Sequence, residues 1–388
     1  MGLTMETPEA SMDFEMTNSV NRSAVAVVVP VFNRIHLLEA TVESLRSQSI
    51  QDIEFLLIDD RSESDVWDYL QQLPARDSRF RVIRKPDHIP RGCQCSRNIG
   101  LDETRSEFVV FLDSDDLLEP YCLETRLKFL QSRPNVDIAI GNQACFDERS
   151  GKSTWINRQY TNFDDLDRFV SLAGPLDVPW VNGGCMLRVE SLKARRIRWR
   201  NEFHWDDAVF HLDCLMAGMR SEWMPRSETP DSWYRQHGGE HYGATLQTPE
   251  GRENTLKMFQ WLFKTLEQSQ KMTSERLACL KRSFFLSCVL PIVDLGTFTL
   301  AKQFCSKAAE WKLFSRSEML RLHLFIRGRR FTKHLNRIRY YLNQFARRRL
   351  LREFFGTAIS TYCSVPVGKN GSPCASSLSH FERIAKET

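Results

Sequence analysis

The stretch FVVFLDSDDLLEP, residues 108–120, joins an apolar run to a cluster of acids. The run Phe108–Leu112 is continuous and apolar, which is typical of a strand buried on both faces of a parallel sheet. Three aspartates follow within four positions: Asp113, Asp115 and Asp116. We expect a helix over Leu117–Gln131 after them.

Strands and helices alternate on the N-terminal side of this stretch. Further strands are expected at Ala24–Val29, which Pro30 would close, at Ile53–Ile58 and at Phe80–Ile83. Helical spacing of apolar residues appears at residues 36–47, Val66–Leu73 and from Arg97 to Thr104. This alternation predicts βαβ units and an α/β fold with a mostly parallel sheet. Ligands of such sheets bind beyond the carboxyl ends of the strands, where Asn33, Asp59, Asp60 and the three aspartates would meet.

After about residue 250 the spacing of apolar residues is only helical. We expect helices at residues 253–268, 273–289, 297–310, 316–327 and 331–351. Ser283–Ala301 is about long enough to cross a bilayer, but Asp294, Pro291 and Gly296 favour two packed helices broken between Pro291 and Gly296. The predicted organisation is a disordered tail (1–23), an α/β domain (24–245), an all-α region (250–355) and a flexible tail (360–388).

The charges are distributed unevenly along the 388 residues. The net charge is only +4, but residues 321–352 contain eleven basic residues and no acid, which leaves 42 basic and 49 acidic residues elsewhere. Phe and Leu recur between the arginines, so this segment is expected to form an amphipathic helix with a cationic face. Such a face would suit anionic lipids. The alternative is a helix salt-bridged to the acidic remainder of the chain.

The cysteines and the N-terminal residues bear on location. Eleven cysteines without any CxxC pair fit neither a disulfide framework nor a zinc ribbon. The first 23 residues are acidic and lack an apolar run, unlike a signal peptide. We therefore expect a cytoplasmic protein, with peripheral binding to the inner face of the membrane through residues 321–352.

Three neighbouring aspartates repel one another unless a cation neutralises them. Hard oxygen ligands in an incomplete protein set suit Mg²⁺ or Mn²⁺ that also binds substrate phosphates. The alternative is that Asp115 or Asp116 caps a helix that begins at Leu117. Both interpretations are open from these residues alone.

Six motifs follow one another between residues 24 and 240: VVVPVFNR (27–34), LLIDDRSESD (56–65), SRNIGLDETRSEFVVFLDSDD (96–116), VNGGCMLRVESL (181–192), WDDAVFHLDCLMAG (205–218) and WYRQHGG (233–239). Together, in this order and spacing, they resemble family 2 glycosyltransferases. The resemblance implies a GT-A fold, with a Rossmann-like, mostly parallel sheet and a metal-binding DxD motif. Two positions depart from the family pattern, Arg61 after the paired aspartates and Asp206 in place of the usual Glu.

The resemblance also implies roles for individual residues. The nucleotide sugar would contact Pro30, Phe32, Asn33, Asp60, Arg97, Asp113, Ser114 and Arg235, with Asp59 bracing the loop beside them. The metal would be held by Asp115, with Asp113 and His237 in its shell. A guanidinium such as that of Arg97 suits phosphate geometry, although a surface helix residue is the alternative.

The second acidic motif would carry the chemistry. Asp207 aligns with the family's general base, and Asp206 is its neighbour. The alternative is that both acids merely begin a helix over Ala208–Met216. Trp180, Gly183, Gly184 and Trp205 would shape the acceptor side, but core packing explains the two tryptophans equally well.

These inferences predict an inverting, metal-dependent hexosyl- or N-acetylhexosaminyltransferase. The donor would be a nucleoside-diphosphate sugar, UDP- in preference to GDP- or dTDP-linked, and the acceptor a lipid-linked glycan or polysaccharide in cell-surface glycan synthesis. No nucleic acid is expected as a partner. The rival hypothesis is a non-catalytic membrane- or nucleic-acid-associating protein with the same scaffold, which would have no need of Asp60, Asp113, Asp115 and Asp207 together.

Overall fold

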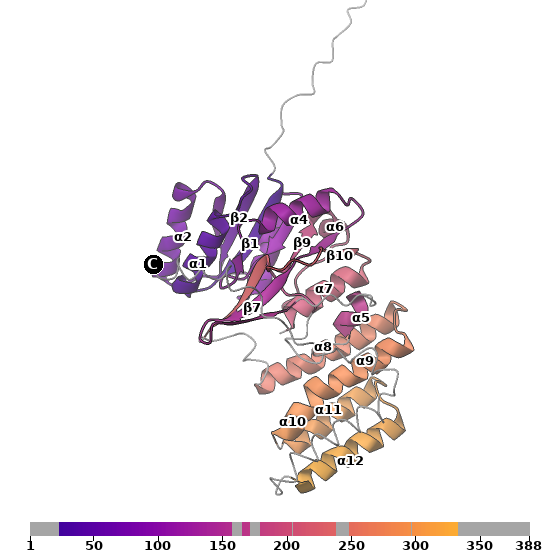
Figure 1. Cartoon of the computed structure of the whole chain (residues 1–388). Helices are drawn as coiled ribbons and strands as arrows, with labels where there is room; N and C mark the ends of the chain where they lie inside the picture. Colours follow the sequence, from indigo (N-terminus) through magenta and orange to yellow (C-terminus); the bar gives the residue numbers. More distant parts are fainter. Residues whose placement is uncertain are drawn as a thin grey trace, which may run out of the picture.

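The computed structural model describes residues 23–156, 165–170, 179–203, 205–237, 248–295 and 297–332. A seven-stranded sheet forms its centre, in the order β10-β6-β9-β4-β1-β2-β3 (Figure 1). The strands are β1 (Val25–Val31), β2 (Ile53–Asp59), β3 (Phe80–Arg84), β4 (Phe108–Phe111), β6 (Ile138–Ile140), β9 (Cys185–Arg188) and β10 (Ser221–Trp223). Strand β9 runs antiparallel to β4 and β6, and the other pairings are parallel. The predicted α/β class with a mostly parallel sheet is confirmed.

Strand β1 is the most buried strand, and it differs in one detail from the prediction. It runs through Pro30 to Val31 instead of ending before the proline. The carbonyl of Val28 accepts from the amide of Leu112, so residues 28 and 30 face the β4 side of the strand. Pro30 has no amide hydrogen with which to continue this ladder, and strand β4 ends at Phe111.

Helices cover both faces of the sheet. Val25, Val27 and Val29 pack with helices α1 (Ile35–Arg46), α2 (Ser64–Arg76) and α4 (Cys122–Gln131) on one side. Ala26 and Val28 face α3 (Cys93–Glu103) and the core beyond it. A Cβ on Gly100 of α3 would lie 2.2 Å from Cγ1 of Val28, so this helix rests directly on β1.

A second, four-stranded sheet was not predicted. Its order is β5 (Leu117–Leu118), β11 (Ser232–Gln236), β7 (Gln143–Asp147) and β8 (Lys152–Trp155). The helix expected from Leu117 is therefore wrong at its start, because Leu117 and Leu118 pair with β11 and α4 begins only at Cys122. Neither Asp115 nor Asp116 caps a helix at Leu117.

The C-terminal part that the structure describes is helical. It consists of α8 (Pro249–Gln268), α9 (Ser274–Phe284), a π-helical turn η2 (Phe285–Val289), α10 (Leu290–Asp294), α11 (Phe298–Glu310) and α12 (Arg316–Thr332). The break expected between Pro291 and Gly296 is found toward the end of that range, because Pro291 lies in the first turn of α10, α10 ends at Asp294 and α11 begins at Phe298. Within the described ranges, no helix is long and apolar enough to cross a membrane. The helix expected at 331–351 lies outside them beyond Thr332.

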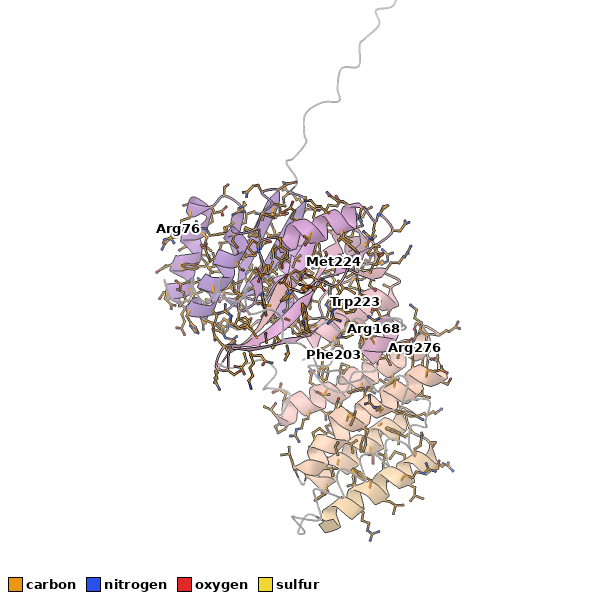
Figure 2. The ribbon with its side chains drawn as sticks, in the orientation of Figure 1. Arg76, Arg168, Phe203, Trp223, Met224 and Arg276 are labelled. Carbon is orange, nitrogen blue, oxygen red and sulfur yellow. The ribbon has the colours of Figure 1, made fainter. Side chains whose placement is uncertain are left out.

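The helices and the sheet share one hydrophobic core. Buried residues of β6 and α7 (Asp206–Met216) belong to the same cluster as those of α8, α11 and α12. Polar contacts reinforce the junction near the short helix α5 (Asp165–Val170). There, Nε of Arg276 lies 2.5 Å from Asp167, and the guanidinium of Arg168 lies 5.0 Å from the ring of Trp223 (Figure 2).

Candidate active site

The loops after β1 and β2 are fastened to each other. Asn33 has a left-handed backbone (φ 53°), and its amide donates to Oγ of Ser62 at 2.9 Å. The amide of Glu63 donates back to Oδ1 of Asn33 at 3.0 Å. Asp59 is fully buried and accepts from the amide of Ser62, which fits its expected bracing role. The hydrogen bonds of Asn33 are likewise structural, while Phe32 stays 46% exposed at the end of β1.

Asp60 has a buried lysine as its partner. Nζ of Lys85 lies 2.6 Å from Oδ1 of Asp60, and the amide of Gly92 donates to Oδ2 at 2.7 Å. Arg61 adds a longer contact of 3.4 Å. Lys85 is only 1% exposed, and the sequence analysis did not identify it. In the sequence, the only sign of this role is that Lys85 is a basic residue that directly follows the third strand.

Arg97 lies between the two acidic motifs. Its guanidinium donates to Asp206 at 2.6 Å and to Asp113 at 2.5 Å, and it lies 4.4 Å from the ring of Trp199. The side chain is 3% exposed. We expected Arg97 to face the diphosphate, but in this structure it pairs with two carboxylates that come from different parts of the chain.

Asp207 begins α7 beside an amide. Nδ2 of Asn182 donates to Oδ1 of Asp207 at 2.5 Å, and the nearest Arg97 nitrogen is 4.0 Å away. Burial, followed by the nearby charge of Asp206, raises the pKa of Asp207 well above its ordinary value. Both aspartates do lie in the first turn of a helix, as the alternative interpretation held, and they also lie beside Arg97. The sequence analysis did not identify Asn182.

The remaining aspartates face β11 and its end. Asp115 contacts Nε2 of His237 at 3.1 Å and Arg34 at 3.3 Å. Asp116 is buried and accepts from the backbone amide of Arg235 at 2.9 Å. Its Oδ2 has no hydrogen-bond partner among the described residues, and burial raises its pKa well above the ordinary value.

These residues can be tested against a divalent cation. In the described part of the chain, no cluster of three or more His, Cys, Asp or Glu side chains forms a complete metal site. Asp115 and His237 nevertheless bring together an oxygen and a nitrogen donor, while Asp113 is engaged by Arg97. A two-donor set suits an ion that completes its shell with water and phosphate oxygens, as Mg²⁺ and Mn²⁺ do. The donor chemistry therefore fits such an ion.

Two expected contacts of the donor side differ in the structure. The guanidinium of Arg235 is turned toward Glu148 (3.7 Å) and the ring of Phe146, and Arg235 is 5% exposed, so it does not lie over a diphosphate site here. Ser114 contributes its carbonyl, which accepts from Oγ1 of Thr41 at 2.9 Å and fixes the loop after β4.

The tryptophans expected on the acceptor side are core residues. Trp180 is fully buried against Phe169 and His211, so no face of its ring is open to a sugar. Trp205 is 7% exposed and donates through Nε1 to Thr255 of α8. The packing alternative holds for both, because α5, α7 and β10 surround Trp180 and α8 covers Trp205. Gly183 and Gly184 lie next to Asn182, beside Asp207.

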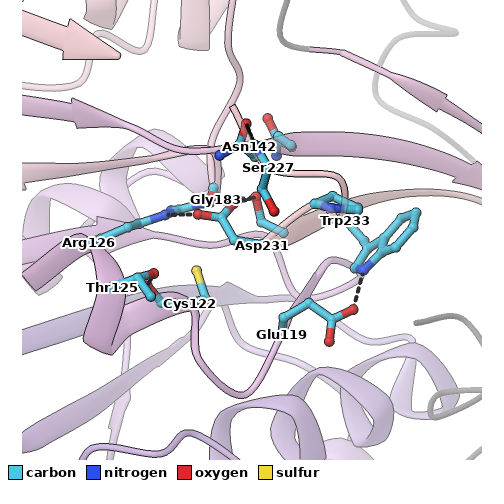
Figure 3. Close-up of polar contacts among 12 residues, drawn as sticks. Glu119, Cys122, Thr125, Arg126, Asn142, Gly183, Ser227, Asp231 and Trp233 are labelled. Carbon is cyan, nitrogen blue, oxygen red and sulfur yellow. Dashed lines mark hydrogen bonds and ion pairs between the residues drawn. The ribbon is translucent and has the colours of Figure 1, made fainter. Parts of the chain in front are cut away.

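A buried ion pair supports this glycine loop (Figure 3). Arg126 of α4 makes two hydrogen bonds to Asp231, at 2.9 and 2.8 Å, and donates to the carbonyl of Gly183 at 2.6 Å. Close by, Nε1 of Trp233 donates to Glu119 at 2.8 Å. Gly183 has φ 75°, a conformation that favours glycine, so the turn depends on both its residue type and this anchor. The sequence analysis identified the glycines but not the ion pair.

Comparisons with known proteins show which family the chain resembles. Residues 26–195 match the model of glycosyl transferase family 2. This part of the chain is similar to glycosyltransferase family 2. Curated relatives include GlyG, a glycosyltransferase of Streptococcus pneumoniae (30% identical over 127 residues), and the GalNAc(5)-diNAcBac-PP-undecaprenol beta-1,3-glucosyltransferase of Campylobacter jejuni (34% over 127 residues). Each match covers 33% of this chain, and 41% and 40% of those relatives.

The fold extends beyond the family match. S. aureus TarS 1–349, solved in complex with UDP-GlcNAc, is similar with a TM-score of 0.60 at 16% identity, over 79% of this chain and 88% of that one. At this identity the likeness concerns the fold alone. The GT-A type sheet with a helical region after it is thus a known architecture, as predicted.

Proposed function

We propose that this chain is an inverting glycosyltransferase that moves a sugar from a nucleoside-diphosphate sugar to a hydroxyl group. The observation behind the proposal is the set of carboxylates Asp113, Asp206 and Asp207 around Arg97, with Asp115 two residues after Asp113; Asp113 and Asp115 follow β4, and Asp206 and Asp207 begin α7. Gathering four acids there raises their mutual repulsion. A structural scaffold gains nothing from that arrangement, whereas transfer from a diphosphate uses acids on both sides of the sugar.

The donor would lie along the ends of β1 and β2. Phe32 offers an exposed ring, with the guanidinium of Arg91 5.1 Å from its centre, and such a pair suits a planar base. Asp60 can accept from a base N–H or a ribose hydroxyl. A UDP-linked donor is favoured because the similar TarS structure contains UDP-GlcNAc.

Asp115 and His237 would hold Mn²⁺ or Mg²⁺, with Asp113 nearby. When bound, the cation would neutralise charge that develops on the departing nucleoside diphosphate. Arg34, 3.3 Å from Asp115, already places a positive charge at this point. Asp113, held by Arg97, would orient the ribose side of the donor.

Asp207 would act as the general base. It accepts the acceptor's hydroxyl proton while that oxygen bonds to the anomeric carbon and the bond to the diphosphate oxygen breaks. The nucleoside diphosphate leaves with the bonding electron pair, so one displacement inverts the configuration. Asn182 keeps the Asp207 carboxylate oriented. The raised pKa of Asp207 makes it a stronger base than an ordinary aspartate.

The acceptor we propose is a lipid-linked or polysaccharide glycan. Its support is the name of the C. jejuni relative, which acts on an undecaprenol-linked glycan. The test is a screen of UDP-, GDP- and dTDP-sugars with Mn²⁺ or Mg²⁺, measuring released nucleoside diphosphate with and without glycan acceptors. Release from one donor class that Asp207→Asn abolishes would support the proposal. Tight nucleotide binding without any turnover on a broad acceptor panel would favour the non-catalytic hypothesis.

A further inference from the structure

Helix α12 exposes two leucines on its outer side. Leu320 and Leu324 are 62% and 59% exposed, whereas Leu322 and Ile326 of the same helix are buried in the shared core. Residues four apart lie on one helix face, so the exposed pair forms one apolar patch. Helix α12 lies at the end of the helical region far from the large sheet (Figure 1).

Arginines flank the leucines. Arg316, Arg321 and Arg327 are all exposed, and at 3.6 residues per turn Arg316 and Arg327 fall beside Leu320 and Leu324. The one acid within residues 316–332 is Glu318, whose carboxylate lies 2.8 Å from Nζ of Lys281. The outer face thus combines exposed apolar side chains with a positive rim.

The combination of leucines and arginines on this face favours one kind of partner. Residues 333–352, outside the described ranges, add seven basic residues and no acid. A nucleic acid would attract the arginines through its phosphates, but it would not remove the leucine side chains from water. An anionic bilayer satisfies both groups, because acyl chains take up leucines and headgroups attract arginines.

We propose that Leu320 and Leu324, with Arg316, Arg321 and Arg327, form a docking face for an anionic lipid bilayer. The leucines enter the boundary between headgroups and acyl chains, and the arginines bind lipid phosphates. The chain is then held peripherally at the membrane surface. This face is separate from the carboxylate cluster, so its test does not depend on the sugar-transfer proposal.

The experiment is co-sedimentation of the full chain with vesicles of phosphatidylcholine plus phosphatidylglycerol, and with phosphatidylcholine alone. The variants are Leu320→Ser with Leu324→Ser, and Arg316→Gln with Arg327→Gln. Each pair should weaken partitioning roughly ten- to thirtyfold. The arginine pair should act mainly at low salt and the leucine pair at all salt concentrations. The matched control is Arg105→Gln with Arg220→Gln, exposed arginines near the large sheet, which should bind almost like the parent.

Three results would overturn the proposal. The first is a parent chain that does not sediment with anionic vesicles. The second is a leucine variant that binds as the parent does, which would leave only charge attraction. The third is a leucine variant with a lowered unfolding midpoint and unchanged vesicle binding, which would mean that the chain covers these leucines itself.

Discussion

The ion pair between Arg126 and Asp231 offers a direct test of how the glycine loop is supported. The substitution Asp231→Asn keeps the size of the side chain but removes its charge. Arg126 is fully buried and its Nε and one terminal nitrogen both bond to Asp231, at 2.9 and 2.8 Å. The variant therefore leaves a guanidinium without its counter-charge in the core, at the centre of Figure 3.

The expected loss is large. Removing one partner of a buried ion pair costs about 3 to 5 kcal/mol, because the remaining charge cannot regain its hydration. Total stabilities are about 5 to 15 kcal/mol, so the variant should lose a sizeable fraction. The control Glu103→Gln breaks the exposed pair with Arg81, at 3.0 Å, and should cost less than about 1 kcal/mol.

Urea unfolding of parent, variant and control measures these free energies. The double variant Arg126→Met with Asp231→Asn should recover part of the loss, since no charge remains buried, and the cycle gives the coupling energy. A loss for Asp231→Asn no larger than that of Glu103→Gln would refute the reasoning. The assay also allows a check on activity, because Arg126 holds the carbonyl of Gly183 next to Asn182, which orients Asp207.

Three further predictions concern the site and its support. Asp207→Asn should lower kcat about 10² to 10⁴-fold and leave the affinity for the donor unchanged. In the parent, kcat should rise as the pH rises through the raised pKa of Asp207, because only the ionised carboxylate can accept the proton. Initial rates measured across a range of pH check both predictions. Asp115→Asn should weaken binding of a nucleoside diphosphate as strongly as a chelator does, which titration calorimetry measures; affinity unchanged by both contradicts the metal proposal. Gly100→Ala should destabilise by about 1 to 3 kcal/mol in urea, because the new methyl group meets Val28, and a neutral result would mean that α3 shifts freely.

The strands of the large sheet could be predicted where complete burial requires an apolar residue at nearly every position. Strands β1, β2 and β4 are buried almost throughout, so their sequences are continuous apolar runs. The second sheet left no such signal. Leu117–Leu118 is too short to show a period, and its partner β11 comes more than a hundred residues later. Its pairing depends on tertiary contacts that local propensity does not contain.

The site was predictable in its acids but not in their partners. Asp113, Asp115 and Asp207 lie in motifs that can be recognised in the sequence. The pairing of Arg97 with Asp206 joins residues 109 positions apart, and the one between Asn182 and Asp207 joins a turn to the start of helix α7. For Trp180 the sequence left a sugar platform and core packing equally open. The structure shows core packing, because Phe169 of α5, His211 of α7 and Trp223 of β10 enclose the ring, and these contacts join distant parts of the chain.

The partners divide the carboxylates into two roles. Arg97 neutralises Asp113 and Asp206, which lowers the repulsion that would otherwise keep four acids from sharing one cleft. Asp115, by contrast, faces His237 and Arg34, on the side where the leaving diphosphate would develop charge. Asp207 faces Asn182 and stays 4.0 Å from the guanidinium, so it is not locked in a close ion pair and its burial keeps its pKa high. In the proposed mechanism, one arginine between the motifs thus leaves Asp115 for the leaving group and Asp207 for the acceptor's proton.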